Sequence, residues 1–103
     1  MSEPDIYYQV SMAPRVREHL DQLEARAISA GRQEEFTRAL DTIEAWLRAD
    51  PASLGEPVRD HAGLRLTEYT GCYGPLIITY GVHWEQQVVF VVRYLRIVRW
   101  AGF

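Results

Sequence analysis

The stretch Gly74–Val98 reads GPLIITYGV-HWEQQ-VVFVVRYLRIV, and this stretch decides the fold. β-Branched and aromatic residues dominate the two apolar runs, as they do in strands, and the short polar break His83–Gln87 predicts a hairpin between them. Both runs are apolar at consecutive positions, which indicates that both faces of each strand are covered over part of its length. Strands of that kind lie in the middle of a sheet, so we expect the rest of the chain to cover them.

The sequence before Pro51 predicts two amphipathic helices. Apolar residues at helical spacing follow Pro14, which is tolerated in a first helical turn, and Gly31 ends this first stripe. A second stripe begins at Phe36 and ends at Asp50, because the residue before a proline avoids the helical region. The two stripes comprise Val16, Leu20, Leu23 and Ala27, and then Phe36, Leu40, Ile43 and Leu47. Two helices of about 17 residues joined at Gly31 make an antiparallel helical hairpin.

Shorter segments complete the expected sheet. Ile6–Val10 reads as a short strand, Pro51–Gly63 as a loop punctuated by proline and glycine, and Thr70–Pro75 as a turn. Leu64–Tyr69 alternates between apolar and polar residues, which predicts a half-buried strand with its leucines inward and Arg65 outward. The element order is then β-α-α-β-β-β. The expected fold is α+β, an antiparallel sheet of about four strands with the helical hairpin packed on one face.

Composition excludes several classes of function. The 103 residues fit a single domain over 1–103, and the formal net charge of −3 argues against general binding of polyanions. Cys72 is the single cysteine, which excludes an internal disulfide and fits a cytoplasmic setting. No apolar run is long enough to span a membrane, and the acidic start of the chain is unlike a secretory signal. No metal-ligand cluster, phosphate-binding glycine motif or nucleophile elbow appears, so we expect no metal or cofactor and favour a small-molecule enzyme least.

The element order and several local phrases resemble the RelE/ParE toxin superfamily, whose members are small bacterial proteins of about this length. They have a short first strand, two helices and a three-stranded meander at the C-terminus. The resemblance covers nearly the whole chain, and its motifs are patterns of apolar and turn residues. The matching phrases are Tyr7–Val10, Asp50-Pro51, Leu54–Pro57, Gly63–Tyr69, Gly74–Val82 and Val88–Val92.

The resemblance implies the toxin of a type II toxin–antitoxin system, with a cognate antitoxin as partner and a homodimer as one candidate state. RelE-like members cleave mRNA on the ribosome, whereas ParE-like members inhibit DNA gyrase by binding, so both targets stay open. The alternative is a catalytically degenerate relative that acts only as a protein-binding module. Its motivations are the acidic balance, the absence of lysine, and Pro75-Leu76 at the strand start where RelE-like toxins usually carry arginine.

For a ribonuclease, the resemblance points to seven residues of the second half. Arginines would bind phosphate and stabilise transition-state charge, a histidine would act as acid or base, and a tyrosine would stack or relay a proton. The candidates are Arg65, Arg93 and Arg96 for the first role, His61 or His83 for the second, and Tyr73 or Tyr94 for the third. The competing interpretation is structural: arginines solvated or paired with acids, histidines in turns, and aromatics in the core or against a partner.

Overall fold

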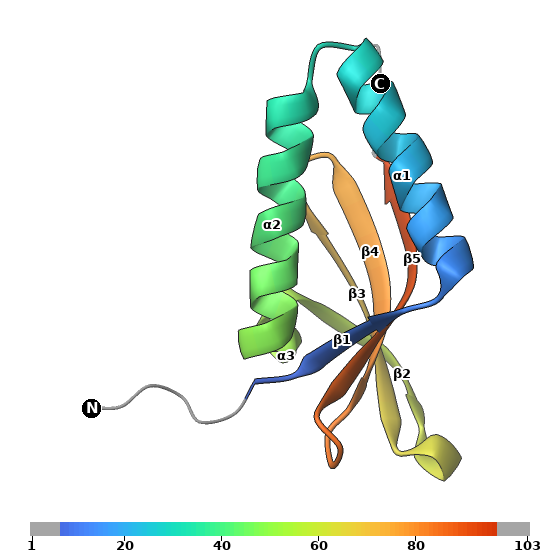
Figure 1. The fold of residues 1–103 in the computed structure, drawn as a ribbon. Coiled ribbons are helices and arrows are strands. Elements are labelled where there is room, and N and C mark those ends of the chain that lie inside the picture. The colour runs from blue at the N-terminus through green and yellow to red at the C-terminus, as the bar shows by residue number, and fades with distance from the viewer. Residues whose placement is uncertain (1–6, 97–103) are drawn as a thin grey trace.

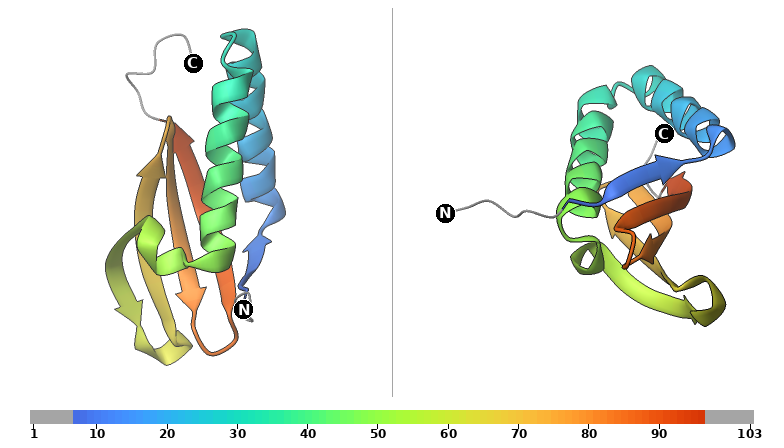
Figure 2. Two further views of the ribbon diagram at one scale, coloured as in Figure 1. Left: turned by 90° about the vertical axis from the view of Figure 1, so that its left-hand side faces the viewer. Right: turned by 60° about the horizontal axis from the view of Figure 1, so that its bottom comes forward.

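The protein, in a computed structural model that describes residues 7–96, has two helices side by side on one face of a five-stranded sheet (Figures 1 and 2). The elements are β1 (Gln9–Met12), α1 (Pro14–Ser29), α2 (Gln33–Ala49), the single turn α3 (Pro51–Leu54), β2 (Gly55–His61), the 3-10 turn η1 (Ala62–Leu64), β3 (Leu66–Tyr73), β4 (Leu76–His83) and β5 (Val88–Arg96). Across the sheet the strands lie in the order β1-β5-β4-β3-β2. The predicted α+β class and helical hairpin are confirmed.

The predicted central hairpin is formed by β4 and β5. These strands pair antiparallel, from His83 opposite Val88 at the turn to Leu76 opposite Arg96 at the far end. β4 is covered on both faces, as expected, and forms the middle strand of the sheet. β5 is covered less completely, because Phe90 and Val92 remain 42% and 48% exposed. Val92 is the extra residue at a β-bulge, since Val91 pairs with Tyr80 and Arg93 with Thr79.

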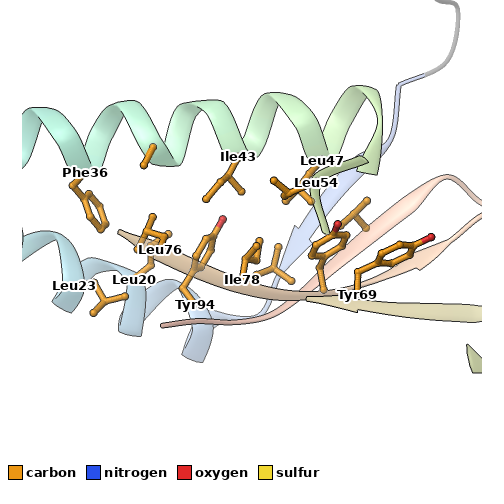
Figure 3. Close-up of a cluster of buried hydrophobic side chains, with 14 of the residues drawn as sticks. Leu20, Leu23, Phe36, Ile43, Leu47, Leu54, Tyr69, Leu76, Ile78 and Tyr94 are labelled. Carbon is orange, nitrogen blue, oxygen red and sulfur yellow. The ribbon is translucent and has the colours of Figure 1, made fainter. Parts of the chain in front are cut away.

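Both helices bury the apolar stripes that the sequence predicts. Pro14 opens α1, and Gly31, with a φ of +72°, allows the chain to turn back into α2. The buried residues are Leu20, Leu23 and Ala27 from α1, and Phe36, Ala39, Ile43 and Leu47 from α2. These side chains pack onto a column of four fully buried residues of β4, Leu76, Ile78, Tyr80 and Val82 (Figure 3). Each large apolar side chain so buried contributes about 1.5–3 kcal/mol to folding.

The loop predicted over residues 51–63 is wrong, because this segment contains α3, β2 and the start of η1. β2 pairs antiparallel with β3 and makes the sheet five-stranded instead of about four-stranded. Its side chains are mostly exposed, and it carries Pro57 and a bulge at Val58, so no alternation of apolar residues marks it. These are features of an edge strand, where proline is tolerated. At its start Gly55 crosses Gly71 so closely that an added Cβ would lie 2.5 Å from the Thr70 carbonyl oxygen.

β3 begins two residues later than predicted and presents the opposite faces. Leu64 is exposed in η1, and Arg65 adopts the left-handed conformation with a φ of 57°, which separates η1 from the strand. Leu66 then lies over Gly81 on the face away from the helices, within 3.4 Å of where a Cβ would stand. Tyr69 faces the helix side and stacks on Tyr80, with ring centroids 5.4 Å apart. The inward residues of this strand are therefore not the leucines.

The first strand and the turn before β4 also differ from expectation. β1 spans Gln9–Met12, and it pairs with β5 in parallel, so the sheet is antiparallel in only three of its four pairings. Ile6, where the predicted strand begins, lies outside the described residues. The predicted turn over residues 70–75 shortens to Gly74-Pro75, because β3 continues to Tyr73. Within residues 7–96, none of the helices combines the length and apolarity that crossing a membrane would require.

Two buried tyrosines predict opposite responses to loss of the hydroxyl group. Tyr80 donates a 2.6 Å hydrogen bond to the Pro51 carbonyl oxygen, whereas the buried Tyr94 hydroxyl, which points toward α2 in Figure 3, has no partner among the described residues. Tyr80→Phe is expected to lower the free energy of unfolding by about 1–2 kcal/mol, and Tyr94→Phe to raise it by about 1 kcal/mol. Urea denaturation of both variants measures this. An equal loss in the two variants would contradict the assignment.

The same tyrosines predict a loss of stability in alkali. Burial raises the pKa of Tyr80 and of Tyr94 well above the ordinary value of 10.0, and the nearby Glu44 raises that of Tyr94 further. Above pH 10 the unfolded chain therefore releases these protons while the folded chain keeps them, so stability falls as pH rises. Each tyrosine adds a slope of up to about 1.4 kcal/mol per pH unit. Tyr94→Phe should remove one such slope between pH 10 and 11.5, and an unchanged slope would argue against burial of the phenol.

Candidate functional site

The face of the sheet opposite α1 and α2 in Figure 2 is here called the open face. The strand register places His61, His83 and Arg93 on it. Strand register arranges its residues in rows, because residues directly opposite one another in a ladder share a face and lie about 5 Å apart. Three of these rows contain the candidate residues. The first row consists of His83, Leu66 and His61, and the second of Phe90, Gly81, Glu68 and Arg59. The third row consists of Arg93, Thr79 and Thr70. Gly81 lies near the middle of these rows, and because glycine has no side chain, nothing projects from the sheet at this position.

His61, the last residue of β2, forms the best-defined polar contact of the open face. Its Nε2 lies 3.0 Å from Oε1 of Glu68, and both side chains are partly buried. A carboxylate in this position fixes the orientation of the imidazole and favours the proton on Nε2. Nδ1 of His61 then keeps its lone pair, which is the arrangement that a general base requires.

His83 occupies the same row on the other side of Leu66. The two histidines are therefore about 10 Å apart between Cα atoms, because two strand spacings separate them. The Gln86 backbone N–H donates a 3.1 Å hydrogen bond to Nδ1 of His83. A neutral His83 consequently carries its proton on Nε2 and can donate a hydrogen bond from that nitrogen. The structure thus brings together the two histidines that are 22 positions apart in sequence, on one face and at one end of the sheet.

Arg93 is also on the open face, exposed and opposite Thr79. Thr79 lies four residues along β4 from His83, so the backbone of Arg93 is about 13 Å along the sheet from the histidine row. A guanidinium can reach back over part of that distance. Arg59, opposite Glu68 on β2, places a second arginine near the histidines from the other side. The open face therefore places two histidines between two arginines.

The three arginines expected to act together are spread over the sheet. Arg65 lies outside β3 in an exposed ion pair with Glu85, in which the single nitrogen Nη1 donates to both carboxylate oxygens at 2.6 and 2.5 Å. Arg96 pairs with Leu76 at the opposite end of β4 from His83, and seven residues of strand at about 3.3 Å each span about 23 Å. The side chain of Arg96 lies outside the described part of the structure. Arg65, Arg93 and Arg96 are thus at one end, the middle and the other end of the sheet.

The two candidate tyrosines are far from the histidine row. Tyr73 ends β3 beside the β3–β4 turn, where its ring meets Trp46 of α2 edge-to-face at 6.1 Å. Tyr94 is completely buried beneath the helices, so from this position its ring cannot stack on a bound base or relay a proton at the surface. The structure supports a packing role for Tyr94 and leaves Tyr73 partly exposed.

Sequence reasoning did not select Glu68 and Arg59 for the site. Glu68 is an alternating polar position of a strand, and nothing local shows that His61 faces it. Arg59 lies in the segment predicted to be a loop. Strand register supplies both residues, and register depends on residues distant in sequence. Among the described residues, no three His, Cys, Asp or Glu side chains gather closely enough to hold a metal ion.

Two known structures with a similar fold are toxin–antitoxin complexes. A chain in the crystal structure of the RelBE2 complex from Mycobacterium tuberculosis aligns with a TM-score of 0.64 and 17% identity, over 92% of this chain and 97% of that chain. A chain of the archaeal RelE–RelB complex from Pyrococcus horikoshii aligns with a TM-score of 0.55 and 19% identity, over 89% and 97%. No protein-family model and no curated protein sequence matches. The likeness establishes a RelE-like fold, as the sequence phrases predict.

The Arg65–Glu85 pair is expected to be weak. Both side chains are exposed, at 65% and 63%, and water screens such pairs. We expect a coupling free energy below about 1 kcal/mol, which an incoming anion can replace. A double-mutant cycle of Arg65→Ala and Glu85→Ala, followed by urea denaturation, measures it. A coupling above about 2 kcal/mol would show instead that Arg65 is a structural residue.

Proposed function

We propose that this protein is the toxin of a toxin–antitoxin module and that a cognate antitoxin binds it. One observation carries the proposal: the fold matches chains of two RelB–RelE complexes, over about nine-tenths of this chain and nearly all of each of those chains. The sequence phrases that resemble the superfamily support the same conclusion. The protein would act in the cytoplasm.

The open face supports RNA cleavage as the toxic activity. His61, whose Nδ1 is left to accept a proton, would take the proton from a ribose 2′-hydroxyl as its oxygen attacks the adjacent phosphate. His83 would enter the step as the imidazolium, with Nδ1 protonated and its hydrogen bond from the Gln86 N–H given up. It would give its Nε2 proton to the departing 5′-oxygen when the phosphorus–oxygen bond breaks. Arg93 and Arg59 would offset the charge on the phosphate oxygens. The half-exposed ring of Phe90 offers a surface on which an unpaired base can stack.

Glu68 would act as a positioning residue in this scheme. Its carboxylate lies 3.0 Å from Nε2 of His61 and would fix the ring in the tautomer that leaves Nδ1 to act as base. Arg65 has no part in the scheme while it is paired with Glu85. The proposed set therefore keeps His61, His83 and Arg93 from the sequence candidates and adds Arg59 and Glu68.

Inducible expression in a bacterial host tests both levels of the proposal. The wild-type chain is expected to arrest growth and to fragment translated mRNA. His61→Ala and His83→Ala should each lower the cleavage rate about 10²–10⁴-fold and relieve the arrest, because a general acid or base contributes on that order. His19→Ala is the matched control, since His19 is an exposed histidine on α1, away from the open face. Circular dichroism confirms that each variant is folded.

Intact mRNA in arrested cells would eliminate the ribonuclease. A supercoiling assay with DNA gyrase would then test inhibition by binding, which is the second activity implied by the resemblance. Normal growth under full expression would remove the toxin assignment itself. It would favour the alternative in which the protein only binds a partner.

A specific observation keeps that alternative in view. The three arginines expected to act together span the whole length of β4, and Arg65 is already paired with an acid. A protein-binding module on this fold needs no clustered cations. Formation of a stable complex with the product of the adjacent gene, without growth arrest or RNA cleavage, is the result that this alternative predicts.

A further inference from the structure

The end of β2 that carries His61 has few side-chain contacts with the rest of the sheet. β2 is an edge strand whose side chains are mostly exposed, and a bulge interrupts its pairing with β3, so burial does not fix its position. Among the described residues, the side-chain hydrogen bonds at this end join His61 to Glu68 and Asp60 to Thr67. The spacing between His61 and His83 therefore depends on a small number of interactions.

Two consecutive hydrogen bonds cross the sheet on the helix side, at the end where the β4–β5 turn and η1 lie (Figure 1). The Trp84 indole N–H donates to Oγ1 of Thr67 at 3.2 Å, and the Thr67 hydroxyl donates to Oδ1 of Asp60 at 3.0 Å. Thr67 is opposite Asp60 on β2 and opposite the buried Val82 on β4, which places it on the helix side. We call Trp84, Thr67 and Asp60 the Thr67 bridge. It links the end of β4 to the end of β2 across β3.

Each member of the Thr67 bridge is the chain neighbour of one member of the histidine row. The three neighbouring pairs are Asp60 with His61, Leu66 with Thr67, and His83 with Trp84. Because successive side chains of a strand point to opposite faces, the bridge and the row use the same backbone from its two sides. A movement of the bridge therefore moves the histidines as well.

Aromatic packing holds Trp84 at one end of the bridge. Its ring meets the ring of Tyr69 edge-to-face at 6.3 Å, and Tyr69 stacks on the fully buried Tyr80. Tyr8 adds a second edge-to-face contact at 5.9 Å. Ring pairs in these arrangements have a preferred orientation, which limits rotation of the indole. The bridge therefore extends from the core to the exposed edge strand.

The Thr67 side chain suits this position. A hydroxyl group can accept a hydrogen bond from Trp84 and donate one to Asp60 at the same time, and branching at Cβ restricts its direction. Asp60 and Trp84 are exposed beside a pocket of about 350 Å³, so water competes for both bonds. Such bonds contribute little to stability. We therefore expect the effect of the bridge to appear in the geometry of the site more than in the unfolding equilibrium.

We propose that Thr67 is a positioning residue for RNA cleavage, because its bridge fixes the distance between His61 and His83. The inference rests on the proposed function, in which these histidines are the base and the acid. Both must reach the same phosphate group, one at the attacking oxygen and the other at the departing oxygen, so a small shift of the edge strand lowers the rate.

Thr67→Val is the direct test, because valine keeps the branched shape and suits a strand but has no hydroxyl. We expect kcat for cleavage of translated mRNA to fall about 10–100-fold. KM should change less than about threefold, because Arg93 lies on β5, outside the bridge. Thr67→Ser keeps the hydroxyl and should stay within about threefold of the wild-type kcat. Thr42→Val is the matched control, since the Thr42 hydroxyl bonds to the Arg38 carbonyl within α2. Equal kcat values for Thr67→Val and Thr42→Val would overturn the proposal.

Two further variants separate hydrogen bonding from charge. Trp84→Phe keeps an aromatic ring but has no N–H, so it should lower kcat in the same direction as Thr67→Val. Asp60→Asn removes the charge and keeps an oxygen that can accept from Thr67, so most of the activity should remain. A loss in Asp60→Asn as large as that in Thr67→Val would assign the effect to the charge and count against the bridge.

Nuclear magnetic resonance of the full ¹⁵N,¹³C-labelled chain tests the bridge without RNA. The indole N–H signal of Trp84, identified by its loss in Trp84→Phe, should shift and exchange faster with solvent in Thr67→Val than in Thr67→Ser. The ring signals of His61 and His83 should move in Thr67→Val and stay near their wild-type positions in Thr67→Ser. Indole and ring signals that are unchanged in Thr67→Val would show that the bridge does not position the histidines.

The two measurements distinguish a failure of this inference from a failure of the proposed function. If the wild-type chain cleaves no mRNA while the signals change as described, the ribonuclease is wrong, and the link that sets the histidine spacing stands. If the wild-type chain and Thr67→Val cleave mRNA at the same rate, the ribonuclease stands and the positioning role is wrong. A slow Thr67→Val variant beside an active Thr67→Ser variant supports both.

Discussion

The structure depends on the burial of β4 between its neighbours and under the helices. Leu76, Ile78, Tyr80 and Val82 form one unbroken apolar column against which both helices pack. Because successive side chains of a strand alternate, this column also determines which residues of β4 appear on the other face. The position of Gly81, Thr79 and His83 on the open face is thus a direct consequence of how the core is built.

The difference in polarity between the two faces of the sheet also follows from the burial of β4 under the helices. α1 and α2 use their apolar stripes on one face only, so polar and charged groups gather on the other. The candidate chemistry is found there because the large side chains on the helix side, such as Tyr94, are fully buried in the core. A buried aromatic ring close in sequence to candidate arginines is therefore a structural residue, while a histidine at the end of an exposed edge strand is accessible.

The elements with strong periodicity could be predicted from the sequence, and the site could not. Local sequence patterns predict the two helices and the central hairpin correctly. These patterns are the apolar stripes that begin at Val16 and Phe36 and the two apolar runs on either side of His83–Gln87. β2 escaped prediction because an exposed edge strand with Pro57 has no apolar alternation to detect. Leu66 was assigned to the wrong face because an apolar residue can also be covered by lying over a glycine. The pairing of His61 with Glu68, and its proximity to His83, depend on register across three strands, which no local pattern specifies.

The pairing of β1 with β5 has a consequence for how the protein is made. The first strand to leave the ribosome pairs with the last, across about eighty residues of intervening chain. Contacts between distant segments form late, because the chain must close a long loop before it gains them. The sheet is therefore completed only after synthesis of the final strand, and a nascent chain lacks the β5 half of the open face. Any activity that depends on the complete open face can therefore begin only after the whole chain has been synthesised.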